Sequence, residues 1–151
     1  MQKWILCTLL ALALAFTVRC ARLLTASAAL EEVDVVVNKS NDIAPLSREE
    51  VRRIFMGDKS SWRGGKRITV LMLAIDQPER VVILQAVFKM NESEYTKYFL
   101  QAAFTGRVQA APRDLPSAAQ MKAHLAANPN AIGYLRKEDV DDGVNVVLKL
   151  P

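Results

Sequence analysis

The side chains that could do chemistry gather directly behind an apolar run of the sequence. Residues 68–75 read ITVLMLAI, and Asp76, Gln77 and then Arg80 follow. In α/β sheets, ligands bind where a strand ends and a helix begins, because the helix start presents free backbone N–H groups. Asp76, Gln77 and Arg80 therefore predict an anion site, with Arg80 as its fixed positive charge. The alternative is structural: Asp76 caps the helix, and Arg80 pairs with Glu79 or faces solvent.

Motifs for catalysis or for metal binding are absent from the sequence. The single histidine, His124, lies on an expected helix, without the HExxH, CxxC, GxSxG or phosphate-loop patterns anywhere in the chain. The acidic cluster at 138–142 is interrupted by Val140 and does not follow the alternating ligands of a calcium loop. We interpret it as a solvated turn. The sequence therefore predicts no enzyme activity, no metal and no cofactor.

A second charged motif surrounds a pair of glycines. Arg63, Lys66 and Arg67 flank Gly64-Gly65. Either these cations meet an anion, or they belong to a charged turn that connects a helix to a strand.

The first residues have the pattern of a targeting segment. Lys3 precedes an apolar run at 5–18, and small residues follow at 26–29. A basic start, a short apolar stretch and an A-x-A site are typical of a secretory signal peptide, and the run is shorter than the roughly 18 residues of a membrane-spanning helix. We expect residues 1–28 to be a signal peptide.

Cleavage at this position would leave an exported domain, residues 29–151, in the periplasm or outside the cell, with no stable membrane anchor. The alternative is an uncleaved anchor, for which Arg19 and Arg22 after the apolar run would be suitable flanks.

Removing residues 1–28 changes both the charge and the cysteine content. Three basic residues and no acidic one are lost, so the formal net charge falls from +4 to +1. The electrostatic argument for a nucleic-acid partner is thereby lost. Cys7 and Cys20 are also removed, which leaves no disulfide or thiolate chemistry.

Strand patterns alternate with helix patterns along the remaining chain, which is long enough for one modest core. Ser47 and Ser117 each begin a capping-box pattern. This alternation predicts an α/β fold with a small mixed, partly parallel sheet flanked by helices. The expected strands and helices are 33–38, 47–56, 68–75, 79–90, 93–104, 117–127, 131–135 and 144–148, with a proline-containing loop at 111–116.

Short motifs spread over residues 33–148 are similar, in their order and spacing, to the second lobe of phosphate-type substrate-binding proteins of ABC transporters. The chain most resembles short, single-lobe members of that family. The motifs are VVVNKSN at 35–41, LSREE at 46–50, IFMG at 54–57, Trp62, DQPE at 76–79, FTG at 104–106 and NAIGY at 130–134.

This resemblance implies one lobe of a type II periplasmic-binding-protein-like fold. It also implies a non-catalytic exported protein that binds inorganic phosphate or a similar oxyanion, through Asp76, Gln77 and Arg80, in ABC-type phosphate transport or sensing. In the family the binding loop carries Gly, Ser and Thr where this chain has Arg80, Val81, Val82 and Ile83, and an arginine is common where this chain has Leu84.

A second hypothesis follows from that difference. The chain would be a binding-inactive lobe that acts as a protein–protein interaction module, docking another envelope protein or a second copy of itself. The hypothesis requires part of the apolar run 81–84 to be exposed.

Overall fold

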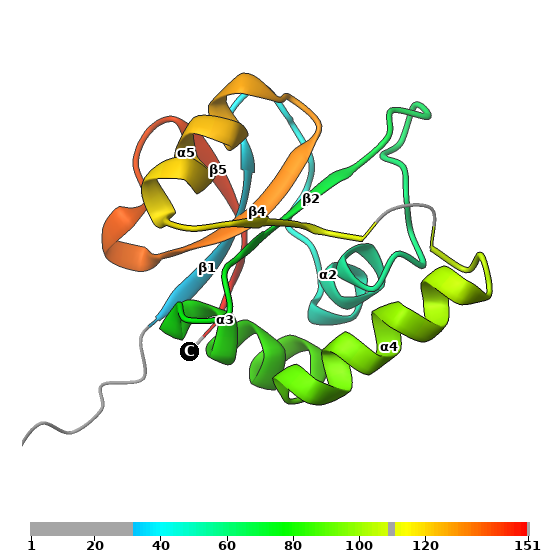
Figure 1. The fold of residues 1–151 in the computed structure, drawn as a ribbon. Helices are drawn as coiled ribbons and strands as arrows, with labels where there is room; N and C mark the ends of the chain where they lie inside the picture. The colour runs from blue at the N-terminus through cyan, green and yellow to red at the C-terminus, as the bar shows by residue number, and fades with distance from the viewer. Residues whose placement is uncertain (1–31, 109–110, 151) are drawn as a thin grey trace, which may run out of the picture. The chain divides into compact units, whose positions relative to one another are not determined.

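A mixed sheet of five strands forms the centre of the domain (Figure 1). The computed structural model describes residues 32–108 and 111–150, so the expected signal peptide at 1–28 lies outside the described residues. The strands lie in the order β3-β2-β4-β1-β5. Their bounds are β1 (Val33–Asn38), β2 (Thr69–Leu73), β3 (Arg113–Leu115), β4 (Ala131–Arg136) and β5 (Val144–Lys149).

The strand directions give the sheet two different ends. β2 runs parallel to β3 and β4, whereas β1 runs antiparallel to β4 and β5, with Val33 opposite Arg136. The carboxyl ends of β2, β3 and β4 therefore lie at one end of the sheet, which we call the tip end. The opposite end holds the start of β2 and the end of β1. The expected partly parallel sheet is confirmed.

Helices flank this sheet, as the sequence predicts. Ser47 and Asn91 cap the first two long helices through complete capping boxes, and Ser117 caps another. The segment expected as a helix at 79–90 is helical from Pro78 to Phe88 and ends in a π-helical turn. The elements are α2 (Arg48–Phe55), α3 (Pro78–Ile83), the π-helix η1 (Leu84–Phe88), α4 (Glu92–Phe104), α5 (Ala118–Ala127) and the 3₁₀ helix η2 (Lys137–Asp139).

Strand β3 is an element that the sequence pattern does not predict. It lies inside the expected loop 111–116 and has only three residues, of which Arg113 and Asp114 are exposed. So short a segment shows no alternation of apolar residues, and its strand form depends on pairing with β2.

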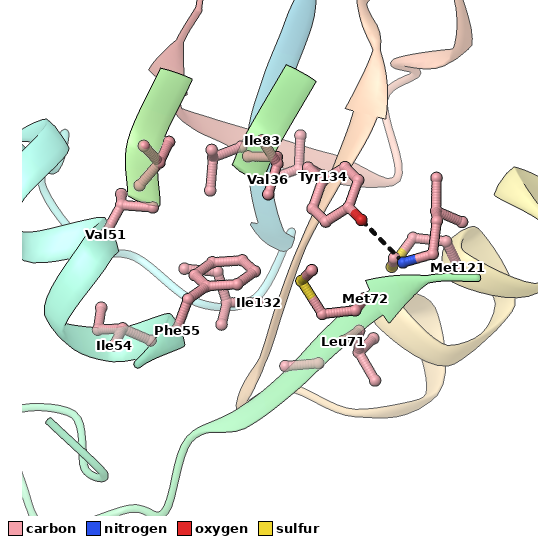
Figure 2. Packing of buried hydrophobic residues seen from close by; sticks show 14 of the residues in the cluster. Val36, Val51, Ile54, Phe55, Leu71, Met72, Ile83, Met121, Ile132 and Tyr134 are labelled. Carbon is pink, nitrogen blue, oxygen red and sulfur yellow. Dashed lines mark hydrogen bonds between the residues drawn. The ribbon is translucent and has the colours of Figure 1, made fainter. Parts of the chain in front are cut away.

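The two faces of the sheet pack against different helices. Gly133 of β4 lies so close to Met121 of α5 that an added Cβ would be 2.5 Å from the sulfur atom. The next residue, Tyr134, points to the other face, where its ring centroid is 6.3 Å from that of Phe55 in α2. Figure 2 shows this apolar packing around Tyr134, with Ile83 of α3 nearby. Residues of β4, α2 and α3 therefore belong to one core.

Candidate functional site

The predicted site lies at the tip end of the sheet, where β2 leads into α3. We call residues 74–77 the β2 tip. The N–H of Ala74 donates to the carbonyl oxygen of Leu115 at 2.8 Å, which ties the tip to β3. The N–H of Gln77 donates to Ala74 at 3.0 Å and closes a tight turn. The tip therefore has a defined geometry at the carboxyl end of a parallel strand, where α/β proteins hold their ligands.

The structure separates the three predicted site residues by depth. Asp76 is exposed and Gln77 is half-buried, and both lie at the surface of the β2 tip. Arg80 lies beneath them, with only 3% of its surface exposed. Gln77 is the N-cap of α3, but its side chain makes no capping hydrogen bond.

The start of α3 offers few free backbone donors. Its first residue is Pro78, which has no N–H, and the N–H of Arg80 already donates to the carbonyl oxygen of Gln77 at 3.1 Å. Glu79, which lies between Pro78 and Arg80 in the sequence, is buried. An anion at this position would therefore depend on side chains more than on the helix start.

Arg80 joins three elements of the tip end. Its Nε and Nη2 atoms each donate to the Glu92 carboxylate at 2.8 Å. Its Nη1 atom donates to Asp114 at 2.8 Å and to the carbonyl oxygen of Leu73 at 2.6 Å. These bonds use four of the five guanidinium N–H groups. Most of the guanidinium N–H groups of Arg80 are therefore already hydrogen-bonded within the protein.

The surroundings of Arg80 keep it charged. Burial alone would lower its pKa, but the hydrogen bonds with Glu92 and Asp114 outweigh that effect and raise the pKa. The guanidinium carbon also lies 5.4 Å from the ring centroid of Tyr95, within the range of a cation–π interaction. Burial raises the pKa of the Tyr95 hydroxyl, which stays neutral.

Glu79 belongs to a second, neighbouring ion pair. Its Oε1 atom accepts a hydrogen bond from Nε of Arg136 at the end of β4. Its Oε2 atom is buried and has no hydrogen-bond partner among the residues that the structure describes. Arg80 thus pairs with Glu92 and Asp114, and Glu79 pairs elsewhere.

Sequence reasoning missed these partners of Arg80. Glu92 lies 12 residues and Asp114 lies 34 residues further along the chain. Glu92 follows the N-cap of α4, where an acidic residue is ordinary, and Asp114 lies in the strand that the pattern did not predict. Neither position carries a local signal for an ion pair.

The other candidate residues are part of ordinary surface structure. His124 is half-buried in the last turn of α5. Asp141 accepts from the N–H of Gly143 at 2.9 Å and pairs with Lys122 at 2.8 Å. Over residues 32–108 and 111–150, no group of three or more His, Cys, Asp or Glu side chains could hold a metal ion. Within the same ranges, no helix has the length and apolar character needed to cross a bilayer.

Comparison with known proteins identifies the class of fold. No family model and no curated protein matches the chain. Solved structures do match: a protein described as a phosphate ABC transporter substrate-binding protein, with bound phosphate, from Clostridium perfringens is 19% identical with a TM-score of 0.62. An ABC-type phosphate transport receptor from Vibrio cholerae is 20% identical with a TM-score of 0.60, and PstS from Borrelia burgdorferi is 13% identical with a TM-score of 0.58.

Each of these alignments covers 76% of this chain but only 43%, 44% and 46% of the respective solved chains. The chain therefore spans less than half the length of the proteins it resembles. It has the fold of a single lobe of periplasmic-binding-protein type, as the sequence resemblance predicts.

Proposed function

We propose that this chain is an exported, non-catalytic lobe of the phosphate-binding type, which takes part in ABC-type phosphate transport or sensing by holding an oxyanion at the β2 tip. The observation that carries the proposal is the position of exposed Asp76 and half-buried Gln77 at the carboxyl end of a parallel strand, in a fold shared with phosphate-binding proteins.

The side-chain amide of Gln77 is the donor best placed for the anion. It is free of any capping bond and stands at the start of α3. The Asp76 carboxylate would accept a hydrogen bond from the O–H group of a protonated oxyanion, because a carboxylate is an acceptor only. The charge of Arg80 is already neutralised by Glu92 and Asp114, so Arg80 would serve the site by holding the tip in place through these ion pairs.

The tip alone supplies too little free energy for tight binding. Micromolar affinity requires about 8 kcal/mol, whereas a helix start contributes about 0.3–1 kcal/mol to a nearby anion. A hydrogen bond from neutral Gln77 adds about 1 kcal/mol. The anion therefore needs a second surface to close over it, and we propose that another lobe or another chain provides that surface.

Calorimetry of the exported domain with phosphate and sulfate tests the proposal. We expect saturable heat at millimolar phosphate, and a weaker response in the Gln77→Ala variant. Gln101→Ala, which removes an exposed glutamine on α4, is the matched control and should bind as the wild type does. A folded domain that gives no heat at millimolar phosphate would exclude oxyanion binding by this lobe alone.

A second candidate function is the interaction module, and exposed apolar side chains beside the tip favour it. Ile75 is 65% exposed and Val81 is 49% exposed. Val82 is half-buried, whereas Ile83 and Leu84 are buried in the core. The interaction-module hypothesis requires part of the apolar run 81–84 to be exposed, and one residue of that run, Val81, is exposed. Ile75 within the β2 tip and Val81 in α3 would suit a surface that another envelope protein or a second copy covers.

Stoichiometric co-purification from envelope extracts and sedimentation of the purified domain test this second candidate. We expect Val81→Glu to abolish a partner or a dimer that the wild type forms. Leu100→Glu places the same charge on another exposed apolar residue, on α4, and should leave the assembly intact. An assembly that survives Val81→Glu would place the interface elsewhere.

A further inference from the structure

A hollow of about 520 Å³ lies at the end of the sheet opposite the tip. One wall is the loop 40–46 that follows β1, and Asn130, directly before β4, forms part of the other. The volume falls within the 300–1,000 Å³ or so that is typical of small-molecule sites. The hollow shares no residue with the β2 tip.

A tight turn fixes the basic wall of the hollow. Ser61 and Arg67 form an antiparallel bridge, and the N–H of Trp62 donates to the carbonyl oxygen of Lys66 at 2.8 Å. The indole N–H of Trp62 donates to the carbonyl oxygen of Asn130 at 3.1 Å, which anchors the turn to the start of β4. The motif that the sequence left open is therefore a hydrogen-bonded turn, and its residues Arg63 and Lys66 line the hollow.

Three cations line this hollow without protein partners. The charged groups of Lys59, Arg63 and Lys66 make no hydrogen bond or ion pair with any other residue in the part of the chain that the structure describes. Glu50, on the same wall, is already engaged, because its carboxylate accepts from the N–H and the hydroxyl of Ser47 at 2.9 and 3.0 Å. Those bonds lower the pKa of Glu50, and the charges of Lys59 and Arg63 lower it further.

The rest of the lining combines polar residues, among them the exposed acidic residue Asp42, with an apolar area. Ile43 and Leu46 are half-buried against the core, and Trp62 forms part of the surface of the hollow. An inorganic ion would leave this apolar area uncovered, whereas an organic anion would cover it.

We infer that this hollow binds a small organic anion, whose apolar body lies against Trp62 and Leu46 and whose phosphate or carboxylate group is held by Lys59, Arg63 and Lys66. The inference does not depend on oxyanion binding at the β2 tip, because the two sites lie at opposite ends of β2 and use different residues.

Tryptophan fluorescence of the full chain tests the inference, with phenyl phosphate as the probe. The chain has two tryptophans, so the Trp4→Phe background leaves Trp62 as the only one. We expect a saturable change in Trp62 emission with phenyl phosphate. The double substitution Lys59→Ala and Lys66→Ala should weaken binding by about a hundredfold, since each of the two charge-assisted hydrogen bonds lost is worth about tenfold. Lys97→Ala, an exposed lysine on α4, is the matched control and should bind as the background does.

Three further measurements test the anionic group, the apolar body and the independence from the β2 tip. Phenol lacks the anionic group and should bind far more weakly than phenyl phosphate, and inorganic phosphate lacks the ring and should compete poorly. Gln77→Ala should leave binding unchanged, even if it removes oxyanion binding at the tip. An unsaturable response, equal binding of phenol, or unchanged affinity in a folded double lysine variant would each overturn the inference.

Discussion

The cations at the two ends of β2 differ in whether they are paired within the protein. At the tip end, Arg80 is buried and bonded to Glu92, Asp114 and a backbone carbonyl. At the other end, Lys59 and Lys66 line a hollow with their charged groups unpaired within the described residues. A charge that is neutralised internally holds the fold together, whereas a charge left unpaired at a concave surface is available to a ligand. The two regions should therefore respond differently to substitution.

The largest difference in stability is expected between a variant that loses the buried, paired Arg80 and one that loses an unpaired lysine of the hollow. Arg80→Ala should destabilise the domain by about 3 kcal/mol, because it leaves Leu73, Glu92 and Asp114 without their partner. The value lies at the low end of the range for broken buried pairs, since the side chains of Glu92 and Asp114 are 31% and 55% exposed and can gain water. Urea denaturation measures the change.

Lys66→Ala is the comparison variant from the hollow. Its charged group has no partner in the described part of the chain, so stability should change by less than about 0.5 kcal/mol. Equal losses in the two variants would contradict the distinction between a structural and an available cation.

A second test concerns the backbone that supports Arg80. The N–H of Leu73 donates to the hydroxyl of buried Tyr134 at 2.9 Å, a bond visible in Figure 2. Tyr134→Phe leaves this N–H buried without an acceptor and should cost about 2 kcal/mol. Thermal denaturation measures the loss, and amide exchange at Leu73 and Arg80 should show weaker protection at the tip end than at Ile68. Uniform exchange at both ends of β2 would contradict a local role for Tyr134.

Most of the fold could be predicted from the sequence, because local patterns decide it. Apolar runs such as 33–38 give buried strands, and Ser47 with Glu50 marks the start of α2 by a capping box that the structure contains. Strand β3 could not be predicted, since its three residues are strand only through pairing with β2. A pattern within one segment holds no information about a partner 40 residues away.

The candidate site was less predictable, for a related reason. The sequence correctly places Asp76 and Gln77 after a parallel strand, but it does not reveal how deeply Arg80 lies or which acids it meets. Depth is set by the tertiary packing of α3 and α4. Oxyanion binding by these residues stays a prediction.

A third test addresses the turn that presents the cations of the hollow. Gly65 has a φ of 80°, and an added Cβ would meet nothing within 4 Å, so only backbone strain opposes a side chain there. Gly65→Ala should therefore cost about 1 kcal/mol. Gly65→Asn should cost less, because asparagine tolerates this conformation better than alanine. Urea denaturation of both variants measures the order, and equal losses would indicate that the turn is not held in this conformation.

The smallest expected effect is a pH dependence, and it comes from a buried acid at the tip end. Asp34 lies in β1, with 4% of its surface exposed, and burial raises its pKa above the ordinary value of 3.8, although Lys149 and Lys137 oppose the rise. The folded state therefore binds a proton more tightly than the unfolded state does. The contribution of Asp34 to stability is present below pH 3.8 or so and is lost as the pH rises through the raised pKa.

Replacing Asp34 removes this dependence and should give a protein that gains relative stability above the raised pKa. Asp141 gives the opposite sign, because its hydrogen bonds with Lys122 and Gly143 lower its pKa, so its contribution is present above pH 3.8 and is lost as the pH falls. Denaturation midpoints of Asp34→Asn and Asp141→Asn, measured between pH 3 and pH 7, should therefore diverge from the wild type in opposite directions. If the midpoints of both variants shift in the same direction, burial does not distinguish Asp34 from an exposed, paired aspartate such as Asp141. The electrostatic difference between the two regions would then be smaller than their contacts indicate.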